Sequence, residues 1–374
     1  MSSNPSADAV IIGGGLIGLA CAVALARDGA TAIVLDDSRP GAASPAAAGM
    51  LAPSIDRSPG PANDFATAAR DRYPTFVDWL EEQTGTHVAL NTAGILQVAL
   101  TAAGVRGLQR AMARDGSAVA RWLDAASLRD LEPPLSHALG AVLHPLDGAV
   151  DTVALLSALR DFCRRASGIT TVAVGAAMIT SMDSVVGVRA SNGTVYQGRH
   201  VIIASGAWAP AIGGLPRSLP ITPLRGQMLS FDGNPLRHVV FGPRGYVVPR
   251  AGSSTTAGQT AQTLVGATSE RVDFDAGTTP AAAHRLHVAG AEILPSLAAA
   301  APDRHWSGLR PVTPDLLPII GPDPDHPAVL YACGHSRNGI LMAPLTGDCI
   351  SALVRGVASP SELQPFSIER FSPT

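Results

Sequence analysis

The sequence feature that most restricts the fold is a glycine-rich turn near the N-terminus. Gly13-Gly14-Gly15-Leu16-Ile17-Gly18 follows a short apolar run, residues 7–12, and opens an Ala-rich segment of helix-forming composition, residues 16–27. A second apolar run, residues 31–35, ends at Asp36. This order predicts a strand-helix-strand unit and therefore an α/β protein built on a Rossmann-like parallel sheet.

Each residue type in this turn suits the binding of a dinucleotide. Gly13 permits the tight turn, Gly15 lets backbone amides approach a pyrophosphate, and Gly18 allows close packing of helix on strand. The N-terminus of the helix, which begins at Leu16, favours the diphosphate charge. Asp36 is placed to accept hydrogen bonds from ribose hydroxyls, and its charge disfavours the 2′-phosphate of NADP. The motif alone does not separate FAD from NAD.

Composition excludes several classes of function. All 27 basic residues are arginine, so a Schiff-base lysine and a P-loop lysine are both excluded. The net charge of -3, without a basic stretch, argues against nucleic acid. A long uncharged and apolar run, residues 9–26, contains the glycine turn and lacks a basic N-terminal flank, which argues against a membrane span or a signal peptide. The widely spaced Cys21, Cys163, Cys333 and Cys349 predict buried thiols in a cytoplasmic protein, with no metal site.

The remaining elements are predicted from periodicity and turn signals. The stretch 38–61 is an irregular loop, and loops of that length in compact domains are usually functional. A second polar loop is expected at 251–262. Helices are predicted over 64–83, 101–131, 152–165, 279–299 and 338–354, and strands over 88–100, 171–189, 200–204, 221–268 and 329–333.

One downstream strand favours FAD over NAD. The run from Val201 to Ala204 ends in Ser205-Gly206-Ala207-Trp208, where small residues would let the backbone pass close to a second part of a long cofactor. An ordinary junction of strand and loop explains this stretch equally well. Because no second G-x-G-x-x-G occurs, a separate NAD(P)H domain is not evident, and electrons would come from the substrate itself.

Taken together, these and further motifs resemble the D-amino acid oxidase superfamily of FAD enzymes, and most closely the glycine oxidases of thiamine biosynthesis. The resemblance rests on stretches in the family's order: GGGLIG (13–18), AAAGMLAP (46–53), ASGAW (204–208), PLRGQ (223–227), GYVVPR (245–250), WSGLRP (306–311) and GHSRNGIL (334–341). It implies a Rossmann-like FAD-binding domain of the glutathione reductase type, joined to an α+β substrate domain with an antiparallel sheet. The expected FAD-binding segments are 1–75, 150–215 and 305–374; the substrate-binding segments are 76–149 and 216–304.

The resemblance also implies the site residues. Arg310 matches the arginine that holds the substrate carboxylate with two parallel hydrogen bonds; pairing with Asp315 is the structural alternative. Tyr246 matches a tyrosine that contacts the same carboxylate, or it only packs, and Arg337 matches a second arginine near the site. Ala47, Ala48, Gly49 and Met50 would lie along the isoalloxazine, although Met50 could equally be core. Further expected cofactor contacts are Arg310, Arg337, Val174, Gly206, Trp208, Gly334, Asn338, Gly339, Ile340 and Leu341.

The start of the final predicted helix, Asn338 to Leu341, would direct its amides at the flavin edge where negative charge appears on reduction. A simple helix cap is the alternative. His335 is expected to be structural. Arg244 and Ser269 are expected at the pocket edge, where an additional arginine would widen the range of substrates.

The resemblance implies oxidative deamination of glycine or another small amino acid or amine, such as sarcosine or a D-amino acid. A hydride would pass from the substrate Cα to flavin N5, dioxygen would give hydrogen peroxide, and water would hydrolyse the imine. FAD is expected to bind non-covalently, because Ser307 to Arg310 contains no thiol. A homo-oligomer is possible, and no membrane partner is expected. The alternatives are a dehydrogenase that passes electrons to a quinone, a flavin-binding protein without turnover and, last, an NAD-dependent dehydrogenase.

Overall fold

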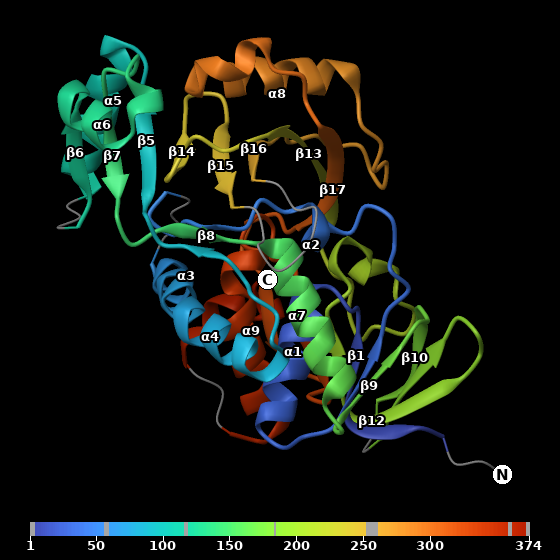
Figure 1. Cartoon of the computed structure of the whole chain (residues 1–374). Coiled ribbons are helices and arrows are strands. Elements are labelled where there is room, and N and C mark those ends of the chain that lie inside the picture. The colour runs from blue at the N-terminus through green and yellow to red at the C-terminus, as the bar shows by residue number, and fades with distance from the viewer. Residues whose placement is uncertain are drawn as a thin grey trace.

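Two eight-stranded sheets make up the body of the protein, and the cartoon in Figure 1 shows them at different levels of the molecule. The computed structural model describes residues 4–55, 60–115, 119–182, 185–251, 261–357 and 361–371. The predicted polar loop at 251–262 lies almost entirely outside the described residues. The sheet that contains the N-terminal strand is called sheet A, and the other is called sheet B.

Sheet A has the strand order β10-β11-β12-β1-β2-β9, and β19 with its partner β18 joins at β12. Strands β12, β1, β2 and β9 pair in parallel, as do β12 and β19. The predicted parallel sheet is therefore confirmed. Its strands are β1 (Ser6–Ile12), β2 (Ala32–Leu35), β9 (Ile169–Val172), β10 (Ala176–Met182), β11 (Val186–Ala190), β12 (Val195–Ile203), β18 (Ile319–Pro322) and β19 (Val329–Cys333).

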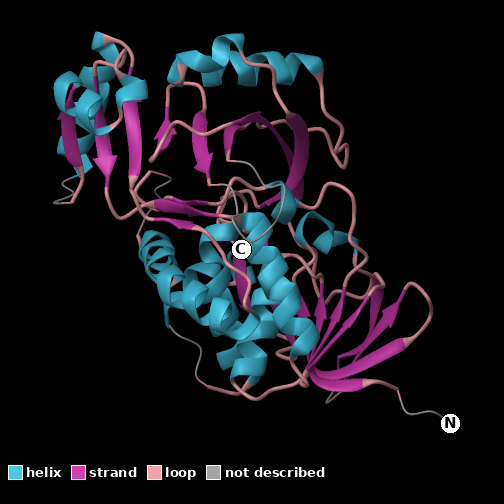
Figure 2. Cartoon of the chain, in the orientation of Figure 1, coloured by secondary structure: helices cyan, strands magenta, loops and turns pink. Residues whose placement is uncertain are grey.

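Helices cover one face of sheet A, as the secondary-structure colouring in Figure 2 shows. Alternate residues of β1 point to two different apolar clusters: Ile11 packs toward the helices, and Val10 packs into the cluster on the other face. A parallel strand covered on both faces needs this continuous apolar character. The helices are α1 (Leu16–Arg27), α3 (Pro61–Asp71), α4 (Tyr73–Thr84), α7 (Thr152–Arg165) and α9 (Gly339–Val354).

Sheet B is largely antiparallel, with the order β17-β13-β16-β15-β14-β5-β7-β6, and α8 (Pro280–Ile293) covers the face turned away from sheet A (Figure 1). Leu229 and Val265 pack with Leu286 of α8, whereas Met228 and Leu264 face the other side. The strands are β5 (Ile95–Ala99), β6 (Arg121–Asp124), β7 (Gly140–His144), β13 (Thr222–Asp232), β14 (Val239–Phe241), β15 (Tyr246–Arg250), β16 (Gln262–Gly266) and β17 (Arg304–Val312).

Short elements connect the two sheets. A small sheet of order β3-β8-β4 is formed by β3 (Met50–Leu51), β8 (Gly148–Val150) and β4 (Leu90–Asn91). The remaining helices are α2 (Ala43–Ala46), α5 (Ala102–Asp115) and α6 (Ala125–Leu131), and 3₁₀ turns occur at Pro133–Leu135, Gly206–Ala211, Pro295–Ala299, Ser361–Phe366 and Ile368–Phe371. The predicted loop 38–61 therefore contains one helical turn and one short strand.

Two predicted helices are wrong in extent. The stretch 101–131 contains strand β6 between two helices, because Asp124 ends the strand and caps α6 by accepting a hydrogen bond from the Ser127 amide at 2.8 Å. The stretch 279–299 is not one helix, because α8 ends at Ile293. Leu294 is extended there, as expected of a residue that precedes proline, and Pro295 begins a separate 3₁₀ turn.

The predicted domain boundary at residue 305 does not follow the pairing of the strands. Strand β17 pairs with β13 along its whole length, so it belongs to sheet B, whereas residues 305–374 were assigned to the FAD-binding segments. The division into two domains otherwise stays a prediction. All four cysteines are buried thiols, as expected. Within the residues that the structure describes, no helix combines the length and apolar character needed to cross a bilayer.

Candidate active site

A cavity of about 560 Å³ lies between the carboxyl ends of the parallel strands of sheet A and the inner face of sheet B. In open α/β sheets, ligands bind at this end of the strands. The cavity brings together most of the residues predicted from the sequence. Its lining includes Gly13, Gly15, Leu16, Ile17, Asp36, Ala47, Ala48, Gly49, Met50, Gly206, Trp208, Tyr246, Arg310, Gly334, Arg337, Asn338, Gly339 and Ile340.

The glycine turn has the close packing expected of it. Gly13 has φ +111°, and a Cβ there would lie 2.5 Å from the carbonyl oxygen of Ala204 at the end of β12. A Cβ at Gly18 would lie 1.9 Å from the carbonyl oxygen of Gly13. A side chain at either position would collide with backbone, so the turn and the start of α1 keep their shape only with glycine.

Ser205 provides a test of whether a large polar cofactor fits here. Ser205 lines the cavity next to the glycine turn, and its hydroxyl is buried and has no hydrogen-bond partner among the described residues. Leaving such a group unsatisfied costs roughly 1–3 kcal/mol, which a bound ligand with a polar atom at this point would remove. Together with the glycine turn and Asp36, this orphaned hydroxyl fits an extended dinucleotide. The prediction missed Ser205, although it stands within a quoted motif.

Short contacts hold the small-residue loop that was predicted to lie along the flavin ring. The indole of Trp306 donates to the Ala46 carbonyl at 3.1 Å, and the Thr152 hydroxyl donates to the Ala47 carbonyl at 2.9 Å. Gly49 has φ +88°, and a Cβ there would lie 2.0 Å from the Val150 carbonyl oxygen. Met50 lines the cavity and also packs against the core cluster beside sheet B, and its place along the flavin ring stays a prediction.

Arg310 and Tyr246 reach toward each other across two glycines in the floor of the cavity. Arg310 on β17 lies over Gly226 of β13, where a Cβ would be 2.3 Å from the arginine's Nη2. Tyr246 on β15 lies over Gly266 of β16, where a Cβ would be 2.5 Å from the tyrosine's hydroxyl oxygen. Because β13 and β16 are neighbours, the guanidinium and the hydroxyl lie over adjacent strands on one face of sheet B.

The surroundings of Arg310 bear on its predicted role. Its Nη1 donates to the Thr268 carbonyl at 3.0 Å. Asp315, the alternative partner considered above, accepts hydrogen bonds from Arg370 with both carboxylate oxygens, at 2.7 and 3.4 Å. The guanidinium of Arg310 thus lines the cavity and is oriented by a backbone carbonyl.

The segment before α9 forms the wall opposite sheet B. Arg337 and the N-terminal residues of α9 line the cavity, and Asn338 makes no side-chain capping bond to the helix. His335 is buried and its Nε2 lies 3.1 Å from the Thr346 hydroxyl oxygen. Burial lowers the pKa of His335 to about 3, so the ring is neutral at ordinary pH. His335 also lines the cavity, and its structural role stays a prediction.

Some of the expected residues lie outside the cavity lining. Gly18 packs against Gly13, as its predicted role in close packing requires, and Val174 and Leu341 are buried in core clusters, so their part in cofactor binding stays a prediction. Arg244 also lies outside the lining, because its Nε donates to Glu292 of α8 at 2.7 Å and its side chain is largely exposed. An additional cavity arginine at position 244 is therefore absent. Ser269 does line the cavity.

Residues that the sequence did not reveal complete the lining. Near the glycine turn, Arg39 stacks over Trp208 with its guanidinium carbon 5.7 Å from the ring centre. Met228, Phe241 and Thr268 line the part next to Arg310 and Tyr246. No local signal marks these residues, because strands distant in sequence bring them to the cavity.

A parallel sheet with a glycine turn, facing a second sheet across one cavity, is the arrangement expected of a dinucleotide-dependent oxidoreductase. A family model described as "FAD dependent oxidoreductase" matches residues 8–353. The chain belongs to this family, and its cofactor is FAD.

The similar proteins agree with this assignment. The chain is 32% identical to a glycine oxidase of Geobacillus kaustophilus, with 97% of each chain covered. A crystal structure of glycine oxidase from that organism has a TM-score of 0.89 at 30% identity and covers 99% of this chain and 100% of the other. The chain is also 35% identical to a bifunctional protein ThiO/ThiG of Synechocystis, covering 99% of this chain but 55% of that protein. It thus spans about half the length of those bifunctional relatives.

Proposed function

We propose that this chain is an FAD-dependent oxidase of glycine or another small amino acid or amine. The observation that carries the proposal is the meeting of Arg310 and Tyr246 over the glycine floor of sheet B, beside a cavity that suits FAD. A planar guanidinium is the side chain best suited to hold a carboxylate with two parallel hydrogen bonds. The glycine oxidase relatives, matched over nearly their full length, support the same choice.

In this proposal the chain binds and orients, and FAD carries out the oxidation. The turn from Gly13 to Ile17, Asp36 and Ser205 would hold the dinucleotide portion, and the loop 47–50 with the start of α9 would enclose the flavin. Arg310 and the Tyr246 hydroxyl would fix the substrate carboxylate, which turns the Cα–H bond toward the flavin. When bound, FAD supplies a hydride acceptor whose electrons pass to dioxygen, and the imine product reacts with water.

Arg310→Ala is the direct test of the substrate site. We expect KM for glycine to rise steeply while FAD content and FAD affinity stay as in the unmodified protein, because Arg310 would act on the carboxylate. Steady-state kinetics and the flavin absorbance of the purified protein measure the two quantities. Unchanged kinetics would remove Arg310 from the site.

The substrate is to be found by an anaerobic bleaching screen of the flavin with glycine, sarcosine and the D-amino acids. Bleaching by at least one of them supports the proposal. If none bleaches the flavin, the result favours the alternative of a flavin-binding protein without turnover. Non-covalent attachment of FAD, a cytoplasmic location and a homo-oligomer stay predictions; flavin that remains on acid-precipitated protein would contradict the first.

A dehydrogenase of the same fold is the second candidate. One relative, 30% identical over 99% of this chain, is the hydrogen cyanide synthase subunit HcnC of Pseudomonas aeruginosa, whose name describes no oxidase. Such an enzyme would pass electrons to a quinone or another acceptor. Hydrogen peroxide formed in step with substrate consumption in air supports the oxidase; turnover only with an added quinone supports the dehydrogenase.

A further inference from the structure

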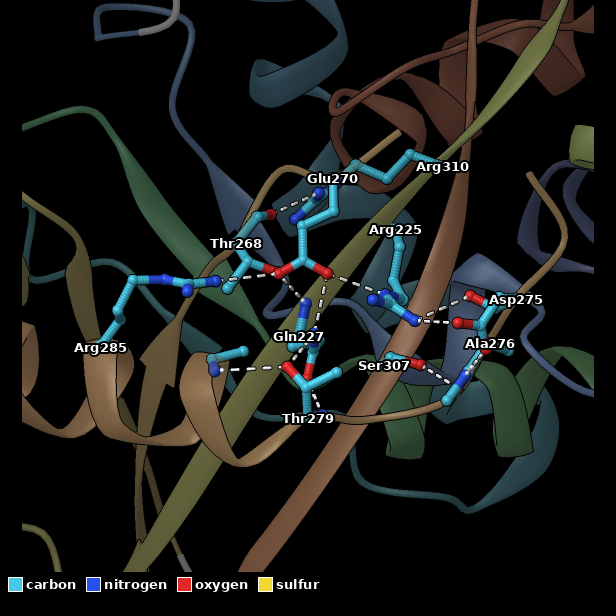
Figure 3. A network of polar contacts seen from close by, with 12 residues as sticks. Arg225, Gln227, Thr268, Glu270, Asp275, Ala276, Thr279, Arg285, Ser307 and Arg310 are labelled. Carbon is cyan, nitrogen blue, oxygen red and sulfur yellow. Dashed lines mark hydrogen bonds and ion pairs between the residues drawn. The ribbon is translucent and has the colours of Figure 1, made fainter. Parts of the chain in front are cut away.

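A buried polar cluster lies on the face of sheet B turned away from the cavity. It consists of Arg225, Gln227 and Glu270, and Figure 3 shows it with its neighbours. Side chains alternate along β13, so Gly226 and Met228 face the cavity while Arg225 and Gln227 face α8. Gln227 is fully buried and Arg225 is 5% exposed. The proposed reaction gives these polar groups no direct part.

Glu270 is the centre of the cluster. Its carboxylate accepts hydrogen bonds from Arg225 Nε at 2.8 Å, from Gln227 Nε2 at 2.8 Å and from Arg285 of α8 at 3.2 Å. Burial opposes ionisation of Glu270, but the hydrogen bonds from Gln227 and Arg225 hold its pKa below the usual value. Gln227 also accepts from the Thr279 amide, which begins α8, at 2.8 Å. The Glu270 carboxylate is therefore charged and hydrogen-bonded on the face of sheet B that is turned away from the cavity.

The cluster fixes an irregular segment that follows strand β16. That strand ends at Gly266, and residues 268–270 then run beside β13. Backbone hydrogen bonds hold them there: the Thr268 amide donates to the Gln227 carbonyl at 3.2 Å, and Arg225 and Glu270 exchange a pair of amide-to-carbonyl bonds at 2.9 and 3.0 Å. The Thr268 hydroxyl also accepts a hydrogen bond from the backbone amide of Gln227 at 2.9 Å. Two residues further on, Glu270 anchors the same segment through its side chain. These backbone bonds remain when the Gln227 and Glu270 side chains are replaced, so the cluster adjusts the position of Thr268 and does not hold it alone.

Thr268 is the point at which the cluster reaches the cavity. Its carbonyl accepts the hydrogen bond from Arg310 Nη1 at 3.0 Å, and Figure 3 shows this contact beside the cluster. We propose that Gln227 and Glu270 are positioning residues that hold the Thr268 carbonyl, and through it set the orientation of the Arg310 guanidinium for a substrate carboxylate. This inference rests on the proposed function, because it assigns a purpose to Arg310 in the same site.

The test measures carboxylate binding without turnover. Acetate added to the FAD-loaded protein should perturb the flavin absorbance, and its dissociation constant can be measured in Gln227→Met and Glu270→Gln. We expect both substitutions to weaken acetate about tenfold, the effect of losing good geometry in hydrogen bonds to a charged group, while FAD affinity stays unchanged. With a substrate that bleaches the flavin, KM should rise by a similar factor and kcat should change little.

Thr263→Val is the matched control. Thr263 is buried in β16 of the same sheet and its hydroxyl donates to the Gly233 carbonyl at 2.7 Å, away from Thr268. The control loses a buried hydrogen bond without touching the cluster, so its acetate affinity should stay unchanged. Equal weakening in the control, or unchanged acetate affinity in both cluster variants, would overturn the proposal. Glu270 is more exposed than Gln227, so Glu270→Gln gives an answer even if Gln227→Met fails to fold.

A double substitution identifies Arg310 as the intermediary. Glu270→Gln should have no further effect on acetate affinity once Arg310 is replaced by alanine, because residues that act through one another are not additive. Full additivity would overturn the proposal. Failure of the proposed oxidase is a separate outcome: no amino acid would bleach the flavin, yet acetate would still bind and still respond to the cluster.

Discussion

Gly226→Ala tests the floor on which the proposed substrate-binding arginine rests. The new methyl group would lie 2.3–2.4 Å from Nη2, Nη1 and Cζ of Arg310. Since non-bonded heavy atoms are comfortable at about 3.5 Å, the guanidinium must move by about 1 Å. A misplacement of this size at a site that orients the substrate costs about 100-fold in rate. We therefore expect kcat/KM for the amino acid substrate to fall by about two orders of magnitude, ~3 kcal/mol of transition-state stabilisation.

The fold should tolerate this change, because the atoms that must move are the end of a flexible side chain. The assay combines steady-state kinetics, the acetate dissociation constant and the FAD content of the purified protein. Gly107→Ala is the matched control: Gly107 is exposed in helix α5, and apart from the backbone of its own helix no atom lies within 4 Å of a Cβ added there. An unchanged kcat/KM in Gly226→Ala would refute the reasoning, as would an equal loss in the control.

Two further predictions concern the cofactor turn and the loop before α9. Gly13→Ala should yield protein without flavin, because its φ of +111° and the Ala204 carbonyl oxygen at 2.5 Å both exclude a side chain; a normal ratio of flavin to protein absorbance would contradict this. Burial keeps the pKa of His335 at about 3, below its unfolded value, so the unfolded chain takes up a proton first as the pH falls and stability declines below pH ~6.5. Between pH 7 and 5.5 this amounts to about 1 kcal/mol. Urea unfolding of His335→Gln should show a pH dependence that is weaker by that amount; identical pH dependence would count against it.

Local signals were sufficient for the elements next to the cofactor. The glycine turn, the Ala-rich run behind it and the Asp151 cap each determine structure through near neighbours, and α1 and α7 begin and end at the predicted residues. The carboxylate of Asp151 accepts hydrogen bonds from the amides of Val153 and Ala154, the capping arrangement expected of it. The parallel sheet followed from these elements because short apolar runs of this kind are typical of strands buried on both faces.

The rest of the site depends on contacts between distant parts of the chain. The motif containing Arg225 and Gln227 was recognised from the sequence. Glu270, which accepts hydrogen bonds from both side chains, stands 43 residues beyond Gln227 and could not be connected to them. Ser205 was visible as part of a strand end, yet only the packed structure shows that its hydroxyl is left without a partner. Arg244 is the opposite case. The resemblance to the family suggested a residue at the pocket edge, whereas the guanidinium binds Glu292 of α8 outside the cavity lining.

The order in which strands enter the two sheets has a consequence for dissecting the molecule. The backbone begins in sheet A, moves to sheet B with β5, returns with β9, leaves again with β13 and ends in sheet A with β18 and β19. No single cut therefore separates a nucleotide-binding piece from a substrate-binding piece. Anyone who wishes to exchange one half for that of another flavoprotein must graft several segments together, and an isolated terminal fragment would contain two incomplete sheets.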